Sequence, residues 1–213
     1  METNHEDPHM TAKPPRYARP RISRILENVV PYGVDIFISG SDGASDIALL
    51  REHGITTVVN CAVNLDFNFV TNPAVEASET QVDHGFGPVR YYKLGLIDGA
   101  GNPETMMLAG YYLLQGAFRQ ILPEKESYPL RERGNVLVNC RGGRSRSVAL
   151  VSLFLHHEMP QLFPTLDDAL DHVRGRRELR PDEWFESPKP VLVEAARWAS
   201  EWIRRIEADL AAH

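Results

Sequence analysis

Cysteine is scarce in this chain, and no long hydrophobic run occurs in it. The only cysteines are Cys61 and Cys140, which excludes a disulfide framework and a zinc ribbon. No stretch approaches the roughly 18 apolar residues that span a membrane, and the polar opening METNHEDPHM is unlike a secretory signal. We therefore expect no transmembrane segment and a cytoplasmic location.

Positive charge is also in deficit. The chain has 23 Lys and Arg against 29 Asp and Glu, a formal net charge of −6, which argues against a surface built to bind nucleic acid. Five cations nevertheless cluster in a proline-rich stretch near its start: Lys13, Arg16, Arg19, Arg21 and Arg24. Proline and charge leave little to bury there, so we expect residues 1–20 to form a disordered or extended arm. Such an arm either lies on the acidic body or meets a phosphate, a membrane surface or a partner.

The remaining residues, 21–213, suffice for one domain with a sizeable core and no structural metal. Apolar, β-branched runs predict strands at 34–39, 55–61, 89–97 and 136–138. Helical spacing and capping signals predict helices at 45–52, 104–122, 148–157, 166–177 and 188–211. Long polar loops occupy 63–87 and 123–134. Strands that alternate with helices indicate an α/β fold with a mostly parallel central sheet flanked by helices.

One segment concentrates chemistry. Residues 139–147 read NCRGGRSRS and lie between a predicted buried strand and an apolar helix. Backbone N–H groups at a helix N-terminus are unpaired and favour anions. Glycines let such a loop curl around a phosphate, which Arg146 can bind with a bidentate fork. The same positive field would lower the pKa of Cys140 and favour its nucleophilic thiolate.

Cysteine, five residues, arginine and then serine resembles the catalytic loop of the protein tyrosine phosphatase superfamily, and residues 143–147 (GRSRS) resemble its dual-specificity branch. The resemblance covers about residues 30–205, including the strands and helix before residue 62 and the segment 173–185. It implies a dual-specificity phosphatase-like fold, with residues 21–213 as a single phosphatase domain. It also implies a hydrolase of phosphomonoesters that needs no metal or cofactor. The simplest substrates are proteins that carry phosphotyrosine, and also phosphoserine or phosphothreonine.

The resemblance assigns roles to individual residues. Cys140 attacks phosphorus and forms a phosphocysteine intermediate, while Ser147 hydrogen-bonds the sulfur. Phosphate binding falls to the residues that follow the cysteine: Arg141, Gly142, Gly143, Arg144, Ser145 and Arg146. The leaving oxygen requires an acid on a movable loop, and we predict Asp98, which ends a predicted strand 42 residues before Cys140 and precedes flexible glycines. The rival acids are Asp66, Asp83 and Glu104.

Two features leave alternatives open. The family usually has histidine before the cysteine, whereas this chain has Asn139, which can hold local hydrogen bonds but cannot carry charge. Arg141 and Arg144 are expected to compensate by adding positive charge. Cys61, at the end of a strand expected to neighbour the one before Cys140, is either a core residue or a redox partner that traps oxidised Cys140 as a disulfide.

Three other functions compete with a protein phosphatase. The extra loop arginines and the basic arm favour a phosphoinositide or other polyanion phosphatase with the same mechanism. Asn139 favours a pseudophosphatase that binds phosphorylated partners without hydrolysing them. A rhodanese-like sulfurtransferase is disfavoured, because its loop typically lacks the serine–arginine–serine ending. The histidines and carboxylates show no pattern of a metal site.

Overall fold

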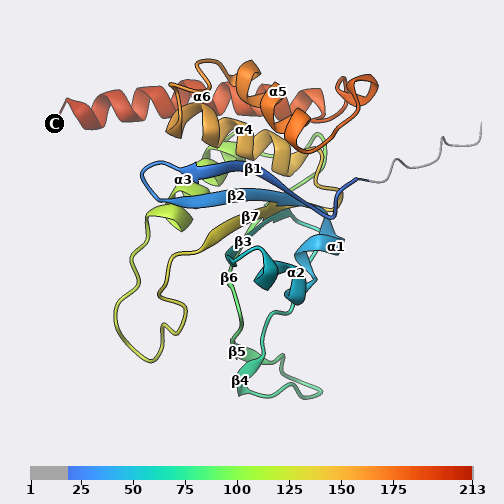
Figure 1. The fold of residues 1–213 in the computed structure, drawn as a ribbon, viewed down its shortest axis with the longest axis vertical. Helices are drawn as coiled ribbons and strands as arrows, with labels where there is room; N and C mark the ends of the chain where they lie inside the picture. Colours follow the sequence, from blue (N-terminus) through green and yellow to red (C-terminus); the bar gives the residue numbers. More distant parts are fainter. Residues whose placement is uncertain (1–18, 213) are drawn as a thin grey trace, which may run out of the picture.

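A five-stranded sheet forms the centre of the molecule in the computed structural model, which describes residues 19–212 (Figure 1). Its strand order is β1-β2-β7-β3-β6. The strands are β1 (Ile22–Val29), β2 (Val34–Ser39), β3 (Ile55–Ala62), β6 (Arg90–Leu96) and β7 (Asn135–Asn139). Neighbours pair in parallel except for the antiparallel β1–β2 pair at the edge. The predicted α/β architecture with a mostly parallel sheet is confirmed.

Helices cover both faces of this sheet. One face carries α3 (Thr105–Arg119), α4 (Arg146–Glu158), α5 (Leu166–Arg176) and α6 (Pro190–Ala211), and the other carries α1 (Ser41–Ala44) and α2 (Ile47–Glu52) (Figure 1). Strand side chains alternate between the two faces. In β7, for example, Val136 and Val138 join the larger core under α4, whereas Leu137 joins the smaller core. None of the helices in the described chain is both long enough and apolar enough to cross a membrane.

The edge strand β1 was not among the predicted strands. It begins at Ile22, immediately after the stretch expected to form the arm, and only Ile25 and Val29 are buried fully enough to belong to the core. Its exposed positions include Arg24, Glu27 and Asn28, so it lacks the continuous apolar run of a central strand. The predicted arm itself falls almost wholly on residues 1–18, which lie outside the described residues.

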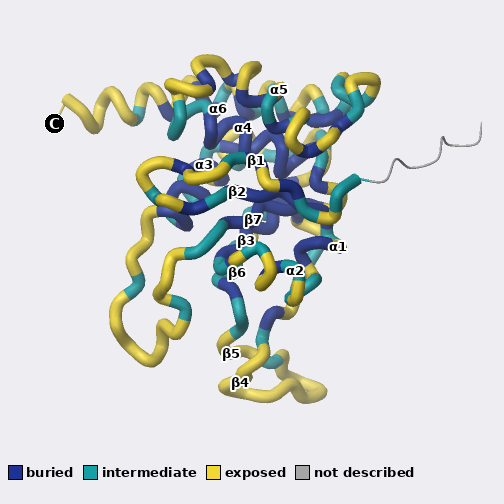
Figure 2. The backbone as a smooth tube through the Cα atoms, in the orientation of Figure 1, coloured by how far each residue is buried: buried dark blue, intermediate teal, exposed yellow. Residues whose placement is uncertain are grey.

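The polar connection at 63–87 contains a small two-stranded sheet that was not predicted. Its strands, β4 (Asn72–Val75) and β5 (His84–Phe86), pair antiparallel and stand away from the central sheet (Figures 1 and 2). All their residues are exposed (Figure 2). This excursion leaves the carboxyl end of β3 next to the loop that follows β7, where the candidate site lies.

Candidate active site

The loop between β7 and α4, residues 140–145, lies at the carboxyl ends of the parallel strands. This is where open α/β sheets usually bind ligands. Its curvature depends on Gly143, which has a φ of +61° and whose missing Cβ would lie 2.6 Å from the Ser39 carbonyl carbon. The carbonyl oxygen of Arg141 accepts a hydrogen bond from the Ser41 N–H (3.0 Å). Neighbouring backbone at the end of β2 thus holds the loop in its curled shape.

Cys140 lies at the start of this loop with only 2% of its surface exposed. Its Sγ atom is 3.3 Å from Ser147 Oγ, as expected if Ser147 hydrogen-bonds the sulfur. Burial is the largest influence on the pKa of Cys140 and raises it. The hydroxyl and backbone N–H of Ser147, the charge of Arg146 and the backbone N–H of Ser145 together outweigh burial and lower the pKa below its ordinary value. The site therefore stabilises the thiolate form of Cys140 relative to that of an ordinary cysteine.

Alkylation tests this ionisation directly. We expect the rate at which iodoacetamide alkylates Cys140 to rise with pH. The midpoint of this rise should lie below the pKa of about 8.5 of a free cysteine. Ser147→Ala removes one stabilising hydrogen bond and should move the midpoint upward. Alkylation is followed by the intact mass of the Cys61→Ser protein, in which Cys140 is the remaining thiol. A wild-type midpoint at or above that of free cysteine would contradict the lowered pKa.

Arg146 is buried beside Cys140, with 2% of its surface exposed. Its Nη1 donates hydrogen bonds to the Leu96 carbonyl oxygen (3.1 Å) and to Asn64 Oδ1 (3.2 Å). These contacts fix the guanidinium at the ends of β6 and β3. Its Nε is also buried, yet it has no hydrogen-bond partner within residues 19–212. Such a donor is costly to leave unpaired, so an anion at the loop would satisfy it.

Asp98 lies on the β6–α3 loop and faces this arginine. Its Oδ1 is 3.9 Å from Arg146 Nε, and its side chain is 43% exposed, so it stands at the mouth of the site. Asn102 holds the loop: its Oδ1 accepts from the Ile97 N–H (2.8 Å), and its Nδ2 donates to the carbonyl oxygens of Ile97 and Gly99 (both 3.0 Å). The loop is thus braced at its base rather than free along its length.

The rival acids lie elsewhere. Asp66 pairs with Lys93, Asp83 accepts from Asn68 Nδ2, and Glu104 lines a separate cavity. Within the described residues none of the three forms an ion pair or hydrogen bond with the β7–α4 loop. Among the predicted acids, Asp98 is the one that the fold brings to Arg146.

Lys189 was missed by the sequence analysis. Its backbone N–H donates to Ser145 Oγ (3.1 Å), and its Nζ donates to the carbonyl oxygen of Asp98 (2.7 Å). Lys189, which immediately precedes α6, therefore connects the β7–α4 loop to the β6–α3 loop that carries Asp98. No local pattern signals this role, because the partners lie 44 and 91 residues away in the sequence.

Arg177 supports the loop from behind. Its Nε donates to the Gly143 carbonyl oxygen (3.0 Å), and its Nη1 donates to Ser23 Oγ (2.9 Å) and to the carbonyl oxygen of Pro20. Burial, together with the nearby charge of Arg19, lowers the pKa of Arg177 to about 10. The sequence favours a structural or surface role for Arg177, and its burial makes that role structural. Arg180 and Asp182 pair with each other at the surface.

The remaining loop residues divide between rim and interior. Arg141 and Gly142 are exposed, and Arg144 is partly exposed with its Nη1 3.8 Å from Glu186 Oε1, whereas Ser145 is buried. Asn139 is fully buried, and its amide forms no hydrogen bond within the described residues. An asparagine amide can hold local hydrogen bonds, but the Asn139 amide makes none within the described residues.

Cys61 and Cys140 lie on neighbouring strands. Because Asn60 of β3 is in register with Asn139 of β7, the next residues on each strand are the two cysteines. Both belong to the larger core and both are free thiols. Burial and the proximity of Cys140 raise the pKa of Cys61. Adjacent strands are about 4.8 Å apart, within the range of Cα separations that a disulfide tolerates. The redox role of Cys61 remains a prediction.

Three groups of the site have complementary chemistry. A buried thiol with a lowered pKa, an unpaired buried guanidinium N–H and a carboxylate at the mouth together can bind a tetrahedral anion, attack it and supply a proton. Between residues 19 and 212, no three or more His, Cys, Asp and Glu side chains gather in a way that would hold an ion. Arg146 and the backbone N–H groups of the loop supply positive charge at the site.

No protein-family model matches the chain. Solved structures do resemble it. A mouse putative dual specificity phosphatase, complexed with zinc tungstate, aligns with a TM-score of 0.59 at 19% identity over 92% of this chain and 97% of that one. Human DUSP28 aligns with a TM-score of 0.54 at 18% identity, over 87% of this chain and 96% of that one. The Yvh1 phosphatase domain from Chaetomium thermophilum aligns with a TM-score of 0.56 at 19% identity, over 86% of this chain and 96% of that one. The predicted dual-specificity phosphatase-like fold is confirmed.

Proposed function

We propose that this chain is a cysteine-dependent phosphomonoester hydrolase, most simply a dual-specificity protein phosphatase. One observation carries the proposal: Cys140, whose pKa is lowered, lies within hydrogen-bonding distance of Ser147 and beside an Arg146 Nε that has no hydrogen-bond partner in the described chain. A structural cysteine needs neither a lowered pKa nor a buried guanidinium with an unused hydrogen-bond donor beside it. Its substrates would be proteins that carry phosphotyrosine, and also phosphoserine or phosphothreonine.

The mechanism follows from these positions. The Cys140 thiolate attacks phosphorus in line, forming the S–P bond as the bond to the leaving oxygen breaks and that oxygen takes a proton from Asp98. Arg146 and the loop N–H groups bind the non-transferring oxygens throughout. Water then attacks the phosphocysteine and gives its proton to the Asp98 carboxylate. The departing sulfur leaves as a thiolate that Ser147 stabilises. The positive charge comes from the loop, so the proposal requires no metal or cofactor.

Hydrolysis of para-nitrophenyl phosphate in the presence of a chelator tests this proposal. We expect metal-free turnover, and rapid denaturation during turnover should trap a phosphoryl group on the Cys140 peptide. The Cys61→Ser variant is the matched control for a thiol outside the reaction and should be labelled normally. Activity that disappears with the chelator, or the absence of trapped phosphoenzyme, would contradict the mechanism.

A second candidate rests on the rim of the site. The exposed Arg141 and the partly exposed Arg144 place two cations around the anion-binding loop. This charge suits a phosphoinositide or another polyanion handled by the same mechanism. A panel of phosphopeptides and soluble phosphoinositides compared by kcat/KM separates the two substrate classes. Binding of these ligands without turnover would instead identify a pseudophosphatase.

The neighbouring thiols predict a response to peroxide. Oxidation of Cys140 to a sulfenic acid, followed by attack of the Cys61 thiol with loss of water, would form a disulfide that a reducing agent reverses. We expect a mass decrease of two hydrogens, a Cys61–Cys140 crosslinked peptide and activity that returns with dithiothreitol. Cys61→Ser should lose activity irreversibly under the same treatment. Over-oxidised Cys140 with Cys61 still free would count against a redox partnership.

A further inference from the structure

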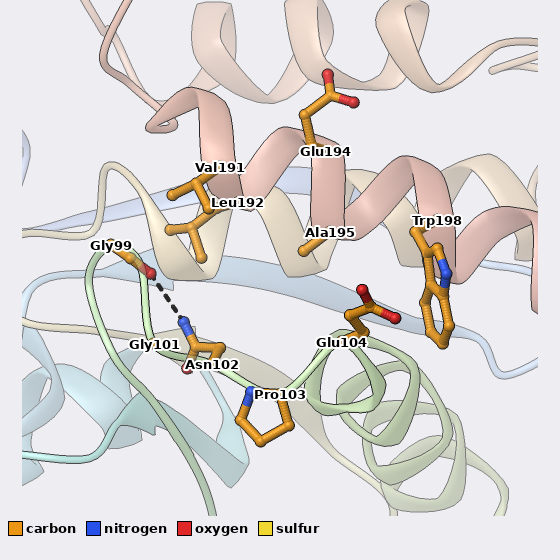
Figure 3. Close-up of a pocket in the computed structure, with 10 residues that line it drawn as sticks. All are labelled: Gly99, Gly101, Asn102, Pro103, Glu104, Val191, Leu192, Glu194, Ala195 and Trp198. Atoms are coloured by element: carbon orange, nitrogen blue, oxygen red, sulfur yellow. Dashed lines mark hydrogen bonds between the residues drawn. The ribbon is translucent and has the colours of Figure 1, made fainter.

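A cavity of about 370 Å³ lies against the loop that carries Asp98 (Figure 3). One wall is the β6–α3 loop and the start of α3, and the other is formed by the first turns of α6. The lining residues are Gly99, Gly101, Asn102, Pro103, Glu104, Val191, Leu192, Glu194, Ala195 and Trp198. None of them belongs to the β7–α4 loop, so the cavity is separate from the site that holds the phosphoryl group.

The lining combines apolar walls with negative charge. Pro103, Val191 and Leu192 present hydrocarbon, and Trp198 adds an aromatic ring, near which Figure 3 shows Glu104. No lysine or arginine lines the cavity. Within residues 19–212 Glu104 forms no ion pair. Glu194, the second carboxylate, points away from the other lining side chains in Figure 3 and lies 3.7 Å from Arg197 on its own helix, so the negative charge of the cavity comes from Glu104.

This chemistry matches one kind of side chain. Lysine and arginine have an aliphatic stem that packs on apolar surface and a cationic end that remains near polar groups. The cationic end gains from a carboxylate such as Glu104 and from the face of an indole such as Trp198. An acidic group, including a second phosphate, would be repelled by Glu104.

The position of the cavity relates it to the substrate. Gly99 follows Asp98 directly, and consecutive Cα atoms are about 3.8 Å apart, so the wall of the cavity begins next to the candidate acid. On the opposite wall Val191 comes two residues after Lys189, whose Nζ donates to the Asp98 carbonyl oxygen at 2.7 Å. An extended peptide advances about 3.3 Å per residue. A residue close to the phosphorylated one can therefore reach the cavity with a long side chain.

We propose that this cavity is a substrate subsite for a lysine or arginine side chain close to the phosphorylated residue. The inference rests on the proposed function and narrows it, since it selects phosphorylated protein segments with a basic neighbour. It also disfavours phosphoinositide headgroups, because these bring additional negative charge to the carboxylate of Glu104.

Paired phosphopeptides test the subsite. In one set of phosphotyrosine peptides, arginine is placed in turn at each of the three positions before and the three positions after the phosphotyrosine. In a matched set, glutamate takes the same positions. We expect kcat/KM to favour arginine over glutamate at one or two positions by roughly 5- to 30-fold, the size of an ion pair plus a cation–π contact. Glu104→Lys should abolish or reverse the ratio. The control Glu201→Lys makes the same charge change at an exposed position of α6 outside the cavity lining and should keep the wild-type ratio.

The outcomes separate the two proposals. Hydrolysis of para-nitrophenyl phosphate with equal kcat/KM for arginine and glutamate peptides would overturn the subsite alone. Faster turnover of phosphoinositides than of any arginine peptide would also overturn it. If the wild type hydrolyses nothing, the proposed function fails. Calorimetric binding of the same peptides, carrying a non-hydrolysable phosphotyrosine analogue, then decides the subsite: tighter binding of arginine peptides that Glu104→Lys removes supports it, and equal binding overturns it.

Discussion

Cys140→Ser should lower the turnover of para-nitrophenyl phosphate by roughly 10⁴- to 10⁶-fold, the scale seen when an enzyme loses its nucleophile. The reason is ionisation. The contacts that lower the pKa of the Cys140 thiol, from Ser147, Arg146 and the backbone N–H of Ser145, cannot ionise a serine hydroxyl at neutral pH. The measurement is steady-state kcat with a chelator present, to exclude contaminating metal-dependent phosphatases.

Binding should survive this substitution. The Arg146 guanidinium and the loop N–H groups remain in place, so Cys140→Ser should hold inorganic phosphate or a phosphopeptide about as tightly as the wild type. Cys61→Ser is the matched control, since it removes the other buried thiol of the same core and should retain turnover. A Cys140→Ser protein within tenfold of the wild type in kcat would remove Cys140 from the reaction.

Asp98→Asn is expected to show the second largest loss, about 10²- to 10⁴-fold for substrates with poor leaving groups. Asparagine fills the same space but has no acidic proton to give. The loss should shrink for a leaving group that departs without protonation. The measurement is therefore kcat for a series of aryl phosphates of decreasing leaving-group pKa. A steeper dependence in Asp98→Asn than in the wild type would identify the proton donor.

The rival acids supply the controls for Asp98. Asp66→Asn and Asp83→Asn change carboxylates that contact Lys93 and Asn68 rather than the β7–α4 loop. Both variants should keep the wild-type dependence on leaving group. If instead Asp66→Asn steepened that dependence while Asp98→Asn left it flat, Asp66 would be the acid and the 3.9 Å contact between Asp98 and Arg146 would be only an ion pair.

Features written into short stretches of sequence were predictable. The run 55–61 is β-branched and apolar because both of its faces are covered, and the observed strand β3 spans Ile55–Ala62. The NCRGGRSRS loop carries its own chemistry, so Cys140, Arg146 and Ser147 were found together. Asp98 was selected because it ends a strand and precedes glycines, and the fold places it 3.9 Å from Arg146; its role as the acid stays a prediction.

Features that depend on distant contacts were not predictable. Strand β1 pairs on one side only, and its charged residues on the exposed face hide the strand pattern. Asn102 resembles an ordinary loop residue until its hydrogen bonds to Ile97 and Gly99 are known. Lys189 acts across 91 residues of sequence on Asp98, and nothing local distinguishes it from any other surface lysine.

Arg177 also ties the first residues of the described chain to the β7–α4 loop. Its Nη1 depends on two oxygens, from Pro20 and Ser23, that precede most of the sheet, while its Nε supports Gly143. A chain shortened to start at β2 would remove both oxygens and leave a buried guanidinium with unpaired donors directly beneath the catalytic loop, a costly arrangement. The residues from Pro20 to Ser23, at the boundary between the predicted arm and the predicted domain, therefore support the β7–α4 loop of the candidate site.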